Sequence, residues 1–308
     1  MLKRIARWGA RRVRSWLQDG SPSQDLSALR DSEFVSDRLA YRLLEMRRRD
    51  PALRGHFAWG VLSAGQLASV LQIPRISVIE FGVAGGNGLV ALESVAAQVA
   101  AIYGIDIDVY GFDTGEGLPP PEDYRDLPNL YRKSGFPMDE AKLRARLTRA
   151  QLVLGDVAST LGQFLATVPA PVGFVSVDVD LYTSTLAVLQ LFDAPLQCLL
   201  PRVYCYFDDI LGETFSEFTG ERLAIAEYNA AHTHHKISPI FGLRYFLPPP
   251  DAHEAWPDQM YIAHLFDHEL YGRFAFTAKD AGGWTELSGT VDAAGPELPG
   301  GRRPDATE

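Results

Sequence analysis

Carboxylates gather at two places in this 308-residue chain, each directly after a hydrophobic run. Asp178 and Asp180 lie in the segment Ser-Val-Asp-Val-Asp-Leu-Tyr-Thr-Ser-Thr, and the pair Asp208-Asp209 begins thirty residues after Asp178. If both runs are strands of one sheet, these acids meet at one edge and repel one another unless a cation neutralises them. Oxygen ligands alone favour Mg²⁺, Mn²⁺ or Ca²⁺, and such an ion can hold substrate oxygens and lower the pKa of a hydroxyl. The alternative is that the acids cap the following helices, with Asp209 in solvent.

A glycine-rich turn marks a second candidate site. Residues 78–88 are Val-Ile-Glu-Phe-Gly-Val-Ala-Gly-Gly-Asn-Gly, a β-branched run followed by glycines and then by a helical pattern. A strand, a glycine turn and a helix let backbone N–H groups approach a nucleotide-like ligand. The spacing differs from the Gly-x-Gly-x-x-Gly pattern of dinucleotide sites. It is Glu-x-Gly-x-x-x-Gly-x-Gly, through Glu80, Gly82, Gly86 and Gly88.

Two further acids stand at the ends of the next predicted strands. Asp113 lies 25 residues after Gly88, within Tyr-Gly-Phe-Asp-Thr-Gly-Glu-Gly-Leu-Pro. A carboxylate there can accept both ribose hydroxyls of an adenosine, as an acid does in dinucleotide folds. Asp156 follows Gly155 at the end of the third strand, where it would face an adenine edge. Each acid alone could be a helix cap, but acids at three successive strand ends favour ligand binding.

These residues need a scaffold whose strand ends converge, and the chain alternates between strand and helix patterns. The predicted strands are Ile76 to Phe81, Ile107 to Phe112, Leu152 to Leu154, Val172 to Val177, Val203 to Phe207, Ile237 to Leu247 and Met260 to Phe266. The predicted helices between them are Gly88 to Tyr103, 139–150, Ser184 to Phe192 and 216–231. The alternation predicts an open, mostly parallel α/β sheet with helices on both faces. Ligands in such sheets lie beyond the carboxyl ends of the strands, where the strand order switches.

Four regions are expected along the chain. Residues 1–24 form a basic N-terminal arm, and 25–74 form a helical extension that is broken at Asp50-Pro51, with its second helix, about 57–72, ending before Pro74. The ligand-binding α/β domain spans 75–275. Residues 276–308 are rich in glycine, proline, alanine and polar residues, a composition typical of a disordered tail.

Composition restricts the partners. The formal net charge of −10 disfavours a nucleic-acid substrate. Two cysteines in apolar surroundings, Cys198 and Cys205, are typical of free thiols in a cytoplasmic protein, and no stretch is long enough to span a bilayer. The basic amphipathic arm would either touch an anionic membrane or partner, or form a solvated helix.

Five segments resemble, in order and spacing, the macrocin O-methyltransferase family of sugar-modifying enzymes. They are VIEFGVAGGNG, VYGFDTGEGLP, LVLGDVAST, VSVDVDLYTST and YFDDI, within residues 76–211. The resemblance implies a Rossmann-like, seven-stranded class I methyltransferase sheet. It implies Mg²⁺-dependent methyl transfer from S-adenosylmethionine to a sugar hydroxyl, so that the expected partner is a small-molecule or glycan acceptor, a sugar or glycosylated metabolite. By the same likeness, and by that to catechol O-methyltransferase, Asp178, Asp208 and Asp209 would be the metal ligands.

The general base is not fixed by this resemblance. The catechol enzyme has a lysine three residues after its strand-four aspartate, and that position here is Leu181. Asp180 is the candidate base, and Asp178 could share the proton while it binds the metal. Tyr182 and a cluster of histidines are alternatives, because a histidine near its ordinary pKa suits the task. The histidines are His232, His234 and His235.

Two segments are candidates for the acceptor side of the site. The long loop Thr114 to Met138, rich in proline and aromatic residues, is expected to be a lid or substrate wall, or else a plain surface loop. The aromatic segment Phe241 to Phe246 is expected either to line the acceptor pocket or to be a core strand. The oligomeric state stays open, with a homo-oligomer among the options. Rival functions are a nicotinamide-dependent oxidoreductase, which the glycine spacing opposes, and a non-catalytic binding module, which would not need the acidic strand ends.

Overall fold

The computed structural model describes residues 27–32, 35–212 and 214–273. They belong to a compact unit, Met1–Ala275; a second unit, Phe276–Glu308, lies outside the described residues. The predicted basic arm, 1–24, and the predicted disordered tail, 276–308, therefore fall outside the part that the structure describes. Within that part, no helix is both long enough and apolar enough to cross a membrane.

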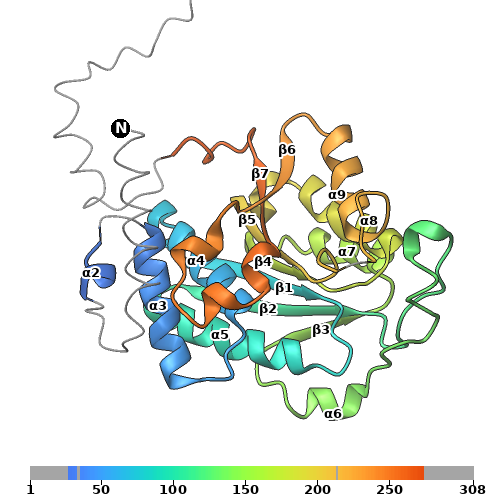
Figure 1. Ribbon diagram of the computed structural model, residues 1–308, viewed down its shortest axis with the longest axis horizontal. Coiled ribbons are helices and arrows are strands. Elements are labelled where there is room, and N and C mark those ends of the chain that lie inside the picture. Colours follow the sequence, from blue (N-terminus) through green and yellow to red (C-terminus); the bar gives the residue numbers. More distant parts are fainter. Residues whose placement is uncertain (1–26, 33–34, 213, 274–308) are drawn as a thin grey trace, which may run out of the picture. The chain divides into compact units, whose positions relative to one another are not determined.

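A single seven-stranded sheet forms the centre of the described chain, in the order β3-β2-β1-β4-β5-β7-β6 (Figure 1). All neighbouring strands are parallel except at β7, which is antiparallel to both β5 and β6. The strands are β1 (Arg75–Phe81), β2 (Asp106–Asp113), β3 (Gln151–Leu154), β4 (Val172–Val177), β5 (Leu199–Phe207), β6 (His235–Pro239) and β7 (Met260–Leu265). This sheet confirms the predicted open, mostly parallel α/β architecture with seven strands.

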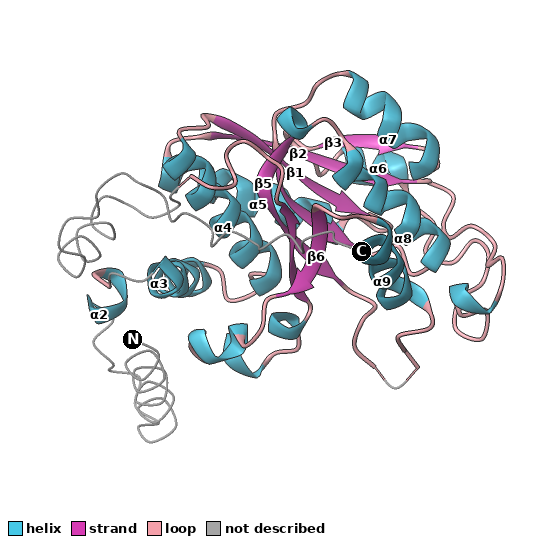
Figure 2. Cartoon of the chain, turned by 90° about the horizontal axis from the view of Figure 1, so that it is seen from above, coloured by secondary structure: helices cyan, strands magenta, loops and turns pink. Residues whose placement is uncertain are grey.

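Helices cover both faces of the sheet, with α4 and α5 on one side and α7, α8 and α9 on the other (Figure 2). The side chains of β1 alternate between the two resulting cores, because successive residues of a strand point to opposite faces. Ile76 and Val78 pack with α4 and α5, whereas Ile79 and Phe81 pack with the other helices. The helices are α2 (Ser27–Arg30), α3 (Val35–Arg49), α4 (Gly55–Leu71), α5 (Asn87–Tyr103), α6 (Glu140–Arg144), α7 (Val157–Ala166), α8 (Tyr182–Leu189) and α9 (Gly220–Ala231).

The described part of the N-terminal extension is built into the core. Helix α4 is buried along most of its length and packs against β4 and β5. Gly60 allows this close approach, since a Cβ there would lie 2.2 Å from the ring of Phe174. The helix ends at Leu71, and its C-cap, Gln72, has a left-handed backbone conformation two residues before Pro74. The expected break at Asp50-Pro51 and the end of the second helix before Pro74 both agree with the structure.

Two predicted elements are wrong in extent. The helix predicted at 139–150 ends at Arg144, and three backbone N–H groups at the end of the predicted range bind the carboxylate of Glu93 instead of a helix carbonyl. They belong to Thr148, Arg149 and Ala150. The strand predicted at 237–247 ends at Pro239, and residues 243–246 form a 3-10 helix instead. Both cysteines are buried free thiols.

Candidate active site

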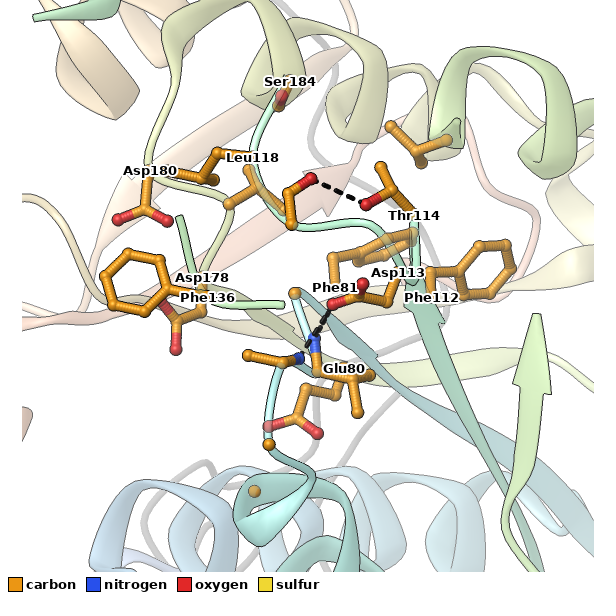
Figure 3. A pocket seen from close by; sticks show the side chains of 18 of the residues that line it. Glu80, Phe81, Phe112, Asp113, Thr114, Leu118, Phe136, Asp178, Asp180 and Ser184 are labelled. Atoms are coloured by element: carbon orange, nitrogen blue, oxygen red, sulfur yellow. Dashed lines mark hydrogen bonds between the residues drawn. The ribbon is translucent and has the colours of Figure 1, made fainter. Parts of the chain in front are cut away.

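A cavity of about 440 Å³ opens at the carboxyl ends of the parallel strands, where the order switches between β1 and β4 (Figure 3). This volume is in the usual range of small-molecule sites. Most of the residues predicted for the site line it. They are Glu80, Gly82, Gly86, Gly88, Asp113, Asp156, Asp178, Asp180 and Asp208. Asp209 is not part of the lining.

The glycine turn, residues 82–88, needs glycine at three positions, each for its own reason. Gly82 has φ +86°, and a Cβ there would lie 1.7 Å from the carbonyl oxygen of Asp178. Gly86 has φ +78°, and its Cβ would meet the side chain of Leu143. A Cβ on Gly88 would lie 1.8 Å from Oε1 of Glu80. The turn therefore brings β1, β4 and the start of α5 together more closely than any side chain would permit.

Glu80 is a buried carboxylate beneath this turn. It is 4 % exposed, and Oε2 has no hydrogen-bond partner among the described residues. Burial raises the pKa of Glu80 well above its usual range, and the charge of Asp178 raises it further, while Arg54 lowers it. A buried acceptor without a partner is costly unless a ligand satisfies it. Glu80 is therefore ready to bind a hydrogen-bond donor or a cationic group in the cavity.

Asp113 ties the second strand to the glycine turn. Oδ2 accepts the backbone N–H groups of Val83 and Ala84, at 2.9 and 2.8 Å, and Oδ1 accepts that of Gly115 at 2.7 Å (Figure 3). The sequence suggested only a role in holding ribose hydroxyls. The structure adds that this carboxylate fixes the backbone of the turn. One lone pair on Oδ1 stays available to the cavity.

Asp156 caps a helix, the role that was the alternative to ligand binding. It is the N-cap of α7, and its side chain accepts the backbone N–H of Ala158 at 2.9 Å. Its side chain is nevertheless exposed and lines the cavity at the end of β3. The capping bond occupies Oδ1, so that Oδ2 can still bind a ligand.

Asp178, Asp208 and Asp209 bring one oxygen each to within 4.8 Å of one another. Asp209 is 9 % exposed, and its Oδ2 has no hydrogen-bond partner among the described residues. Burial by the surrounding protein raises the pKa of Asp178 to about 8, with added repulsion from Asp208 and Asp209. The pKa of Asp209 rises to about 6, again mainly through burial. An all-oxygen set with an unpartnered buried carboxylate fits a hard divalent cation.

Three neighbours that the sequence did not predict hold this cluster in place. Tyr206 donates its hydroxyl to Oδ1 of Asp208 at 2.5 Å, and Tyr131 donates to Oδ1 of Asp209 at 2.8 Å. Glu221, fully buried at the start of α9, accepts the backbone N–H of Asp209 at 3.0 Å. The position of Tyr206, two residues before Asp208 on one strand, was a usable signal; nothing in the sequence pointed to Glu221.

Among the candidate bases, Asp180 is the one best placed. It lines the cavity, and its φ of +60° is a strained conformation of the kind found at functional sites. Burial, followed by the charge of Asp209, raises the pKa of Asp180 to about 7. Tyr182 is engaged instead with Glu227 and Arg125, outside the cavity lining.

The histidine cluster lies near the amino ends of the parallel strands, at the opposite end of the sheet from the cavity. Strand β6 runs parallel to β5, because both are antiparallel to β7, and His235 is its first residue. His232 pairs with Asp193 at 3.0 Å, also away from the carboxyl ends of the strands. These histidines are therefore not candidates for a base in this cavity.

Of the two segments considered for the acceptor side, only the long loop reaches the cavity. Leu118, Gly135 and Phe136 belong to the lining. None of residues 241–246 does, although Phe241 and Tyr245 are exposed.

Comparison with known proteins gave likeness of fold only. No protein-family model and no curated protein matched the chain. A crystal structure of CalS11, a calicheamicin methyltransferase, is 23 % identical, covering 81 % of this chain and 100 % of that one, with a TM-score of 0.47. An O-methyltransferase from Bacillus cereus in complex with SAH is 16 % identical, covering 73 % and 91 %, at 0.32. The MycE methyltransferase of the mycinamycin pathway, in complex with Mg, SAH and mycinamycin VI, is 14 % identical, covering 82 % and 57 %, at 0.34.

Proposed function

We propose that this chain is an S-adenosylmethionine-dependent O-methyltransferase that acts on a hydroxyl of a sugar or glycosylated metabolite with the help of Mg²⁺. The observation that carries the proposal is that one cavity joins the glycine turn to the acidic cluster. A donor bound at the turn and an acceptor bound at the cluster would thus be adjacent.

The charges around the cavity favour this donor over a dinucleotide. Six carboxylates line it, and Arg54 is the one cationic side chain among its described lining residues. A pyrophosphate would find a single cationic partner among these described residues, whereas carboxyl groups suit a sulfonium compound with ammonium and hydroxyl groups. The glycine spacing already opposed a nicotinamide cofactor, and the charge balance now opposes it independently.

At the donor end, the residues of the turn have separate tasks. Glu80 offers a buried acceptor to an ammonium or hydroxyl donor, and the backbone of 82–88 forms a floor without side chains. Asp113 and Asp156 would accept hydrogen bonds from the nucleoside part, Asp113 through the remaining lone pair of Oδ1 and Asp156 through Oδ2.

At the acceptor end, Asp178, Asp208 and Asp209 would hold the cation. When bound, it would orient the acceptor oxygen and lower the pKa of its hydroxyl. Asp180, with a pKa of about 7, would take the proton of that hydroxyl as the oxygen attacks the methyl carbon in line; the methyl–sulfur bond would break, and the sulfonium would leave as a neutral thioether. Tyr131, Tyr206 and Glu221 keep the carboxylates in place. Holding the two reactants together supplies much of the acceleration.

Calorimetric titration tests the donor assignment without knowledge of the acceptor. We expect S-adenosylmethionine to bind the folded protein and NAD⁺ to give no heat of binding. Binding of NAD⁺ in preference to S-adenosylmethionine would instead support the oxidoreductase.

A further inference from the structure

The lid segment, residues 114–138, is fixed to the domain at points remote from one another along the chain. Asp126 is fully buried and accepts the backbone N–H of Thr183, at the start of α8, at 2.9 Å. Further along, Leu118 exchanges backbone hydrogen bonds with Ser134 and Gly135, at 2.8 and 2.9 Å. The segment is therefore a held wall of the cavity, although it contains only one short 3-10 turn.

Tyr131 attaches the lid segment to the acidic cluster. Its hydroxyl reaches Oδ1 of Asp209, 78 residues further along the chain, at 2.8 Å. The backbone N–H of Asp209 is at the same time bound by Glu221. Asp209 is thus held from both sides, and Oδ2 is the oxygen left without a partner.

The same segment brings Phe136 into the cavity. Its ring lies beside the carboxylates of Asp178 and Asp180 (Figure 3), and 60 % of the residue is exposed. Its backbone has φ +56°, a left-handed conformation that costs a bulky residue roughly 1–3 kcal/mol. An exposed aromatic ring kept in a strained conformation beside the acidic cluster is suited to stack on the apolar face of an acceptor ring.

We propose that Tyr131 is a positioning residue that couples the lid segment to the acidic cluster, so that cation binding there and closure of the wall carrying Phe136 form one equilibrium. The inference rests on the proposed metal site. Since coupling between two equilibria is reciprocal, a cation that stabilises the closed lid must bind more tightly when the lid is closed. Loss of the Tyr131 hydroxyl should weaken both closure of the wall and cation binding.

Hydrogen exchange and calorimetry with Mg²⁺ alone test this without an acceptor. In Tyr131→Phe, we expect the backbone amides of Tyr131 and Ser134, which are bonded within the segment, to exchange about tenfold faster than in wild type. Mg²⁺ should slow their exchange in wild type and bind the variant about tenfold more weakly. Tyr124→Phe is the matched control, because Tyr124 lies in the same segment and is 68 % exposed; it should behave as wild type.

Asp209→Asn separates the hydrogen bond to Tyr131 from binding of the cation. Its amide oxygen still accepts from Tyr131, so that the lid amides should stay protected without metal, whereas the response to Mg²⁺ should disappear. Equal Mg²⁺ affinity in wild type and Tyr131→Phe, or no Mg²⁺ binding at all, would overturn the coupling. Titration of the same samples with S-adenosylmethionine distinguishes these outcomes from failure of the methyltransferase proposal, which predicts donor binding in every variant.

Discussion

At the scale of single residues, the cavity concentrates carboxyl groups, and Arg54 is the one cationic side chain among its described lining residues. Asp178 and Asp180 have raised pKa values, and the buried oxygens of Glu80 and Asp209 lack partners. Groups in such surroundings cluster at functional sites. Their arrangement divides the cavity into two regions, a donor region under the glycine turn and a cation region beside β4 and β5.

Replacing one carboxylate should show that the two regions bind their ligands independently. We expect Asp178→Asn to abolish Mg²⁺ binding, measured by calorimetry, and to leave affinity for S-adenosylmethionine within about threefold of wild type, since the donor contacts lie elsewhere. Asp156→Asn is the control for the metal: asparagine still caps α7, and Mg²⁺ binding should persist. Parallel loss of both ligands in Asp178→Asn would point to misfolding.

The raised pKa values predict how Mg²⁺ and pH act together. The pKa of Asp178 is about 8 in the folded protein and about 3.9 when unfolded, so that the folded state binds the extra proton and loses stability as pH rises between these values. A cation replaces that proton. Mg²⁺ should therefore raise Tm more at about pH 8 than at about pH 5.5, as measured by differential scanning fluorimetry. A larger effect at the lower pH would contradict the cluster as the binding site.

The site residues that end strands could be predicted from the sequence, because parallel strands bring their carboxyl ends to one edge of the sheet. The residues that hold these carboxylates in place could not be predicted from the sequence. Tyr131 comes from an irregular loop and Glu221 from a helix, and their contacts with Asp209 depend on the tertiary path of the chain. For the same reason, the backbone contacts of Asp113 with the glycine turn were not predictable.

At the scale of elements, the glycine turn depends on backbone packing. Gly82→Ala would place a methyl group against the carbonyl of Asp178 in a left-handed conformation. We expect this change to lower the free energy of unfolding by about 3 kcal/mol and to weaken donor binding. Gly162→Ala, within α7 with nothing near its Cβ, should instead stabilise by up to about 1 kcal/mol. Urea denaturation measures the free energy of unfolding of both variants. Equal changes in the two would show that close packing at the turn does not require glycine at position 82.

Sequence patterns predicted best the elements that pack deepest in the core. Strand β1 and helix α5 agree closely with their predicted ranges, whereas α6 is much shorter than its amphipathic pattern indicated. The pattern around Leu143 is real, but the N–H groups of residues 148–150 bind the carboxylate of Glu93 instead of continuing the helix. Such a competing side chain lies far away in sequence and leaves no local signal.

At the scale of the whole molecule, the described part of the N-terminal extension belongs to the fold, since α4 completes one core. The basic arm, 1–24, lies outside the described residues, and its two interpretations differ in a measurable way. If it contacts anionic membranes, deletion of residues 1–18 should reduce co-sedimentation with anionic vesicles and leave donor binding unchanged. Unchanged co-sedimentation would leave the solvated helix as its interpretation.

The most direct test of the central claim is a calorimetric titration of S-adenosylmethionine into the folded wild-type protein, with Asp178→Asn alongside. The account predicts binding of one molecule per chain in both proteins, because the donor region does not depend on the acidic cluster. Absence of binding to folded wild-type protein at millimolar ligand would contradict it.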